Sequence, residues 1–280
     1  MRRLLREARS QAYPLFTSAV QQRIKQQVKS SDTLFVLGSG SSVCDLSPDF
    51  LRSIEAHDSL GLNFWLIHDL VPTYYFVESS HVAERNEVFN QLITLKAKQY
   101  RNTYFFPHYD LETFGRPDLL KLPPQESENV YATIRWKLAT VDPKALQYAL
   151  RVWWFALRRY GPYHGISSAV AAVTFGMMLG YRDIVLVGVD LSNTLYFWEA
   201  DPDKYRGVPT PPNIEGSGVH YTADREKVGF YVRQLPIQEQ LRILADDLCR
   251  RQQIRLWTAS ERSMLSSFLP VYRAEQAATV

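Results

Sequence analysis

The chain has 280 residues, 46% of them hydrophobic, so it can bury a full core and is expected to fold rather than remain disordered. Its formal net charge of +3 is too small for the dense basic face that nucleic-acid-binding proteins use, and we expect no nucleic-acid partner. Only two cysteines are present, Cys44 and Cys249, which excludes a disulfide framework and favours a reducing compartment.

Residues 1–30 predict a basic amphipathic helical extension that Pro14 divides into two helices. Two interpretations stay open: a helix packed on its own domain, or a helix lying on an anionic membrane. The region lacks the apolar core and cleavage site of a secretory signal, and the weakly polar run 166–181 is too short to span a bilayer. We therefore expect a cytoplasmic protein, with peripheral contact at the inner face of the membrane as the open alternative.

Strand and helix patterns alternate along most of the remaining chain. Apolar or aromatic runs predict strands at 33–37, 60–67, 73–78, 102–107, 183–192 and 254–260. Amphipathic or small-residue runs predict helices at 50–58, 81–98, 144–161, 166–181 and 234–252. This alternation is typical of an α/β fold, here a Rossmann-like parallel sheet with helices on both faces. We assign residues 31–190 and 220–270 to this domain.

Two segments interrupt the alternation. Residues 108–130 carry glycine, prolines and charges and predict a surface excursion. Residues 191–219 are also rich in proline and glycine, and so long an irregular stretch in a compact fold predicts a small lid subdomain over the active site. Within the helix predicted at 144–161, the aromatic run Trp153 to Phe155 is interpreted as a buried seam rather than a membrane or sugar contact.

The stretch 33-TLFVLGSGSSVCDLSP-48 places small residues directly after a buried strand. Such a turn lets backbone N–H groups reach a phosphate, although a tight turn without a ligand would look the same. The stretch matches neither the dinucleotide-binding glycine pattern nor the P-loop. It is therefore a candidate anion site that the rest of the sequence must support.

Three further features are candidates for chemistry. Asp190 ends a hydrophobic strand, where α/β proteins place ligand-contacting groups; a turn or cap residue is the alternative. His220 follows the predicted lid and is the candidate general base, with a surface histidine as the alternative. The spacing 201-DPD-203 could hold a metal ion against a diphosphate, but its place among prolines favours a solvated turn, and we expect no metal site.

The order of these motifs resembles the bacterial sialyltransferases of glycosyltransferase family 42, which extend lipooligosaccharide. The resemblance covers roughly residues 33–268 and is most specific in the block 179-LGYRDIVLVGVD-190. The other matching pieces are the glycine loop, Asn63 in 60-LGLNFW-65, Ser167-Ser168-Ala169, and Val219-His220-Tyr221.

The resemblance implies a GT-A-like variant of the Rossmann-like fold and an inverting, metal-independent sialyltransferase without a cofactor. CMP-sialic acid would be the donor, and a glycan or glycolipid hydroxyl the acceptor. His220 would take the proton from that hydroxyl while donors to the CMP phosphate stabilise its developing charge. The residues implied in nucleotide binding are Gly38, Ser39, Gly40, Ser41, Ser42, Asn63, Ser167, Ser168 and Asp190.

The chain departs from the family pattern at three places. Ser41 stands where the family has Pro, and Ala169 where it has Gly. Ser192 stands where the family places a Tyr that donates to the leaving phosphate, and Tyr196 or Trp198 could serve as a second donor. These departures leave two alternatives open: a pterin pyrophosphokinase-like phosphotransferase, or a catalytically silent protein on the same fold. The aromatic helix at 144–161 is also a candidate interface for a homo-oligomer.

Overall fold

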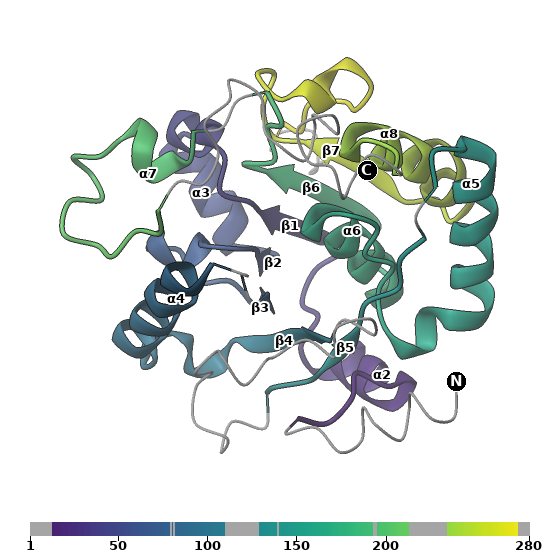
Figure 1. Cartoon of the computed structure of the whole chain (residues 1–280), viewed down its shortest axis with the longest axis horizontal. Helices are drawn as coiled ribbons and strands as arrows, with labels where there is room; N and C mark the ends of the chain where they lie inside the picture. Colours follow the sequence, from purple (N-terminus) through teal and green to yellow (C-terminus); the bar gives the residue numbers. More distant parts are fainter. Residues whose placement is uncertain are drawn as a thin grey trace.

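The computed structural model describes residues 13–78, 80, 82–109, 129–138, 140–192, 195–212 and 234–273. Its centre is a seven-stranded sheet in the order β5-β4-β3-β2-β1-β6-β7, in which all paired neighbours run parallel (Figure 1). The strands are β1 Thr33–Leu37, β2 Asp58–Gly61, β3 Tyr74–Val77, β4 Tyr104–Tyr109, β5 Thr133–Ile134, β6 Asp183–Val187 and β7 Arg255–Thr258. The predicted α/β fold with a parallel sheet is confirmed.

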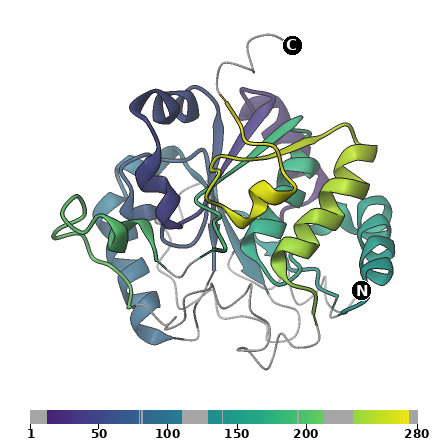
Figure 2. The same ribbon diagram turned by 90° about the horizontal axis from the view of Figure 1, so that it is seen from above.

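Helices cover both faces of this sheet, as the two views show (Figures 1 and 2). They are α2 Ser18–Gln27, α3 Pro48–Glu55, α4 Ala83–Lys96, α5 Pro143–Val152, α6 Ser168–Leu179, α7 Phe197–Ala200 and α8 Ile237–Ile243. Strand β1 explains the two layers, because Leu34 and Val36 join the core beneath α6 whereas Phe35 and Leu37 join the core on the opposite face. A strand buried on both sides needs the continuous apolar run that its sequence has.

Helix α6 lies close against the sheet because its residues are small. A side chain at Gly176 would put its Cβ 2.8 Å from Ile184 Cδ1 and 2.9 Å from Leu34 Cδ2, closer than packed atoms allow. Ser167 caps the start of the helix, since its side chain accepts a hydrogen bond from the Ala169 N–H, and Gly180 caps its end in the left-handed conformation. These caps fix where the N-terminus of α6 points.

Several predicted element boundaries are wrong. The predicted strand 60–67 ends at Gly61, because Asn63 has a φ of 50° and the chain then turns through a short 3-10 segment at Trp65–Ile67. Strand β6 ends at Val187 rather than 192, since Gly188 and Leu191 both have positive φ. Strand β5 was not predicted at all.

The aromatic seam is confirmed only in part. Trp153 and Trp154 are buried, but Phe155 is 82% exposed, because α5 gives way to a π-helical turn at Trp153–Leu157 that carries Phe155 outward. The helix predicted over 144–161 is confirmed as an unbroken helical segment over 143–160, whose C-terminal part winds as a π-helical turn and then a 3-10 turn.

The N-terminal and lid assignments stay predictions. In the described part of the first region, α2 packs against α6 and its Ile24 is fully buried. In the described part of 191–219, Phe197 and Tyr205 are buried in the core on the α3 side of the sheet. Among the helices of the described ranges, none combines the length and the apolar character needed to cross a membrane.

Candidate active site

A cavity of about 220 Å³ opens at the carboxyl ends of the parallel strands. It is lined by the loops that follow β1, β2, β3 and β6, and by the N-terminus of α6. Strand β1 pairs with β2 on one side and with β6 on the other, so the chain reverses its direction of winding between β1 and β6. Ligands of open α/β sheets bind outside such a switch point.

The glycine loop after β1 is built to touch the loop after β6. A Cβ at Gly38 would lie 2.6 Å from the Gly188 carbonyl oxygen, and one at Gly40 would lie 2.4 Å from Asp190 Oδ2, so neither position has room for a side chain. The Gly38 N–H donates to the Val187 carbonyl at 2.7 Å, and the Gly40 N–H donates to the Gly188 carbonyl at 2.8 Å. These two N–H groups are therefore held by the end of β6 and the loop that follows it, while a phosphate contact by the rest of the glycine loop stays a prediction.

Asp190 ties the same two loops together through its side chain. Oδ2 accepts a hydrogen bond from the Ser42 backbone N–H at 2.9 Å, and Oδ1 accepts one from Ser42 Oγ at 2.5 Å. Asp190 borders the cavity, but both carboxylate oxygens face Ser42. Ser41 and Ser42 are buried and do not line the cavity, whereas Ser39 does. Its hydroxyl is buried without a hydrogen-bond partner among the described residues.

Asn63 and the start of α6 face the cavity from two other sides. Asn63 is exposed there, in the left-handed conformation that asparagine tolerates, and its carbonyl accepts a hydrogen bond from Tyr75 Oη at 2.7 Å. Ser167 and Ser168 line the cavity at the N-terminus of α6. The free N–H groups and the dipole of a helix N-terminus favour an anion at this point.

Tyr196 lines the cavity beside the glycine loop. It forms an isolated antiparallel bridge with Gly40, and its ring stacks on Trp198 at a centroid distance of 4.5 Å. Trp198 is buried and supports Tyr196 without lining the cavity, and Ser192 does not line it either. His220, the predicted base, lies outside the described residues.

A buried histidine, His68, packs against Phe197, the residue that follows Tyr196. His68 stacks on Trp65 at 4.5 Å and packs edge-on against Phe197, next to Tyr196. Its Nδ1 accepts a hydrogen bond from the Leu70 N–H at 3.0 Å, which requires a neutral ring. Burial, assisted by Lys204, lowers the pKa of His68 to about 4.

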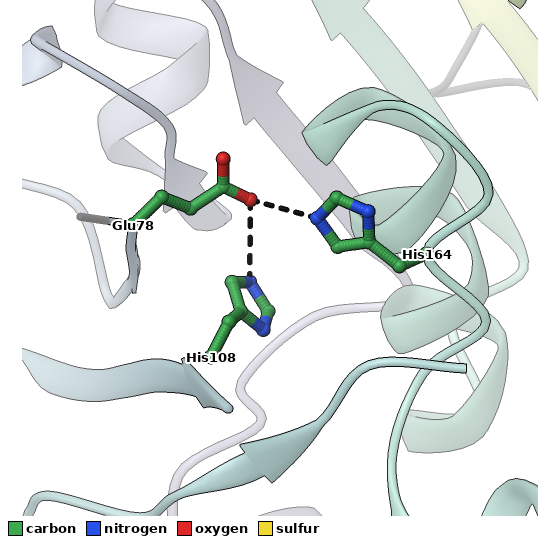
Figure 3. A group of neighbouring side chains, drawn as sticks. All are labelled: Glu78, His108 and His164. Atoms are coloured by element: carbon green, nitrogen blue, oxygen red, sulfur yellow. Dashed lines mark hydrogen bonds and ion pairs between the residues drawn. The ribbon is translucent and has the colours of Figure 1, made fainter. Parts of the chain in front are cut away.

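The structure also assembles a cluster that sequence analysis missed. Glu78 follows β3, His108 lies in β4, and His164 lies in the loop before α6; the three side chains point toward one another (Figure 3). Glu78 Oε1 is 2.8 Å from His164 Nε2, 3.9 Å from His108 Nε2 and 3.0 Å from an Arg135 guanidinium nitrogen. Glu78, Arg135 and His164 line the cavity.

The charges of this cluster are set by burial and by the arginine. Burial by itself would raise the pKa of Glu78, but the Arg135 guanidinium and the hydrogen bond with His164 outweigh it and hold that pKa well below its usual range. Burial lowers the pKa of His108 well below its usual value against the pull of Glu78, and it lowers the pKa of His164 too. The cluster therefore holds an ionised carboxylate, a guanidinium and two neutral imidazoles.

The predicted site residues thus fall into two groups. Those that do not line the cavity are Ser41, Ser42, Ser192 and Trp198. Those that the structure brings to the cavity are Gly38, Ser39, Gly40, Asn63, Ser167, Ser168, Asp190 and Tyr196. Their roles stay predictions, as does that of His220.

No family model matches the chain, and no curated protein matches its sequence. Three solved chains are similar in structure. The monofunctional α-2,3-sialyltransferase Cst-I from Campylobacter jejuni has 16% identity, with 88% of this chain and 82% of that chain covered, at a TM-score of 0.48. The sialyltransferase CstII from the same organism, in complex with the substrate analogue CMP-3FNeuAc, has 15% identity, 86% coverage of both chains and a TM-score of 0.44. A substituted CstII in complex with CMP has 13% identity, the same coverage and a TM-score of 0.45.

Proposed function

We propose that this protein is a glycosyltransferase that uses a CMP-activated sugar, and specifically an inverting sialyltransferase that moves sialic acid from CMP-sialic acid to a glycan or glycolipid hydroxyl. The observation that carries the proposal is the cavity at the switch point between β1 and β6, where Asn63, Tyr196 and the N-terminus of α6 converge. These are positions at which the motif resemblance expects nucleotide and phosphate contacts.

The electrostatics of the cavity suit an anionic donor. The positive end of the α6 dipole lies at the cavity, and Arg135 and Lys137 add positive side chains to the wall. The nucleotide would lie along Ser39, Asn63 and Ser168, with its phosphate toward α6 and the Tyr196 hydroxyl. Hydrogen-bond donors that are already oriented before the reaction stabilise the negative charge that develops on the phosphate, without having to reorganise. This stabilisation makes CMP a better leaving group.

In the proposed transfer, His220 accepts the proton of the acceptor hydroxyl while that oxygen attacks the anomeric carbon. The bond from the anomeric carbon to the phosphate oxygen breaks, and CMP leaves with that electron pair. Tyr196 donates a hydrogen bond to the leaving phosphate as the second family donor, and Ser192 stands where the family has its first. These steps run on protein groups alone. We place the enzyme in the cytoplasm, with its N-terminal region available to a membrane-bound acceptor.

Release of CMP from CMP-sialic acid, measured with a panel of galactoside acceptors, tests this function. We expect His220→Ala to slow transfer by about 100- to 10,000-fold and to leave CMP affinity intact. Asn63→Ala is the matched control and should weaken CMP binding first. No CMP release to acceptor or water, or wild-type transfer by His220→Ala, would contradict the proposal.

A thermal-shift comparison of CMP with ATP, with and without magnesium, separates the alternatives. Preference for CMP supports the transferase, because a ligand at 100 times its Kd adds about 2.7 kcal/mol to stability. A shift with ATP and magnesium alone would instead indicate a phosphotransferase, and no shift with any nucleotide a silent protein.

A further inference from the structure

Three side chains from separate elements converge on one point at the edge of the cavity, and the transfer chemistry proposed above does not use them (Figure 3). Glu78, His108 and His164 each offer one ligand atom, and these atoms all lie within 4.8 Å of one another. We propose that Glu78, His108 and His164 form a binding site for a divalent transition-metal ion of the zinc type.

The strongest evidence is a buried nitrogen without a partner. His108 is packed so that its side chain is 0% exposed, and its Nδ1 lies 2.6 Å from Thr133 Oγ1. Its other nitrogen, Nε2, has no hydrogen-bond partner among the described residues and faces Glu78 Oε1 across 3.9 Å. That distance is too long for a hydrogen bond, and a buried ring nitrogen left unpaired costs free energy. Two ligands of a tetrahedral zinc ion, each about 2.0 to 2.2 Å from the metal, stand roughly 3.4 Å apart. A shared cation therefore satisfies both atoms with a small shift.

The hydrogen bond between His108 and Thr133 supports the same conclusion. Metal-ligating histidines commonly donate their second ring N–H to a neighbouring oxygen, which fixes the ring and leaves the other nitrogen free to ligate. Thr133 lies on β5, next to β4 in the sheet, so the ring of His108 is oriented by the fold itself.

The donor set selects the class of metal. Two imidazoles and one carboxylate suit zinc and similar transition metals, whereas magnesium and calcium prefer oxygen ligands. Three protein ligands leave a tetrahedral ion one open position, as in catalytic rather than structural zinc sites. Glu78 and His164 both line the cavity, so that position would border the cavity. The family resemblance implies a metal-independent enzyme, and this site departs from it.

Arg135 is the competitor for this site. Its guanidinium lies 3.0 Å from the same oxygen of Glu78 and supplies the positive charge that a metal ion would supply. Metal binding therefore requires Arg135 to turn away from Glu78. Arg135→Gln should then tighten metal binding by about tenfold or more, since a like charge near the ion is removed.

Measuring the metal content of the protein tests this proposal independently of glycosyl transfer. A protein that binds no metal would overturn this proposal and leave the proposed function untouched. The full-length chain is stripped with a chelator, reloaded with Zn²⁺ or Co²⁺ and dialysed. Mass spectrometry then counts the metal, and visible absorption of Co²⁺ reports its coordination. We expect about one ion per chain with the absorption of a tetrahedral site.

Substitutions of the proposed ligands test whether the ion binds at Glu78, His108 and His164. Glu78→Gln changes a side chain at the cavity edge with little effect on packing and should remove the tetrahedral Co²⁺ signal; His108→Asn should do the same. His57→Gln is the control, because that half-buried ring contacts the Ser53 carbonyl away from the cluster. Metal content far below one ion per chain in the wild type would overturn the proposal. So would an equal Co²⁺ signal in Glu78→Gln, or weaker binding in Arg135→Gln.

Discussion

The side-chain bridge between Ser42 and Asp190 should stabilise the cavity as well as shape it. Asp190→Ala removes a buried carboxylate that accepts two hydrogen bonds and leaves the Ser42 N–H without its acceptor. A hydrogen bond to a charged group contributes about 1.5 to 3 kcal/mol, and a stranded buried donor costs a similar amount. We therefore expect Asp190→Ala to lower the free energy of unfolding by about 3 kcal/mol and Ser42→Ala by about 1.5 kcal/mol.

Urea denaturation of the two single variants and the double variant measures the coupling between them. Because Ser42→Ala removes a bond that Asp190→Ala also removes, the double variant should be less destabilised than the sum, by about 1.5 kcal/mol. CMP affinity should fall by a similar factor in both single variants, about three- to tenfold, because each loosens the same loop. Additive destabilisation would refute the bridge. Loss of CMP binding in Asp190→Ala alone would show that Asp190 contacts the nucleotide directly.

Three further predictions concern the walls of the cavity. Gly40→Ala should destabilise the protein by at least about 2 kcal/mol in urea denaturation, because its Cβ would collide with the Asp190 carboxylate; a stable variant would show that the loops can separate. Tyr196→Phe should slow CMP release by about 10- to 100-fold at nearly unchanged CMP affinity, and an unchanged rate would remove Tyr196 as the phosphate donor. The folded-state pKa of His68 is lowered to about 4 from 6.5, so the unfolded chain binds more protons between these values, and stability present above pH 6.5 is lost as pH falls toward 4. The loss should be about 3 kcal/mol larger in the wild type than in His68→Gln, measured by urea denaturation at pH 7 and pH 4, and equal losses would contradict a buried neutral ring.

The sheet could be predicted because its strands are buried on both faces and therefore carry continuous apolar runs. Strand ends were harder to place. The run 60–67 stays apolar past Gly61, and nothing in it shows that Asn63 adopts a positive φ. Strand β5 has only two residues and pairs only with β4 among the described strands, so it leaves no pattern to detect. Apolar runs show where a strand is stable, whereas its ends depend on single backbone angles that tertiary contacts decide.

The residues of the candidate site could also be predicted only in part from the sequence. The strand-end rule that selected Asp190 applies equally to Glu78, which directly follows β3, so that residue could have been found from the sequence. His108 could not, because it lies within the aromatic run of β4 and its partners come from segments distant along the chain. The glycine pattern also could not show that the N–H groups of Gly38 and Gly40 bond to the carbonyls of Val187 and Gly188, at the end of β6. Glycines permit close approach of any backbone, and only the sheet order, which places β6 beside β1, decides whether that backbone belongs to the protein or to a ligand.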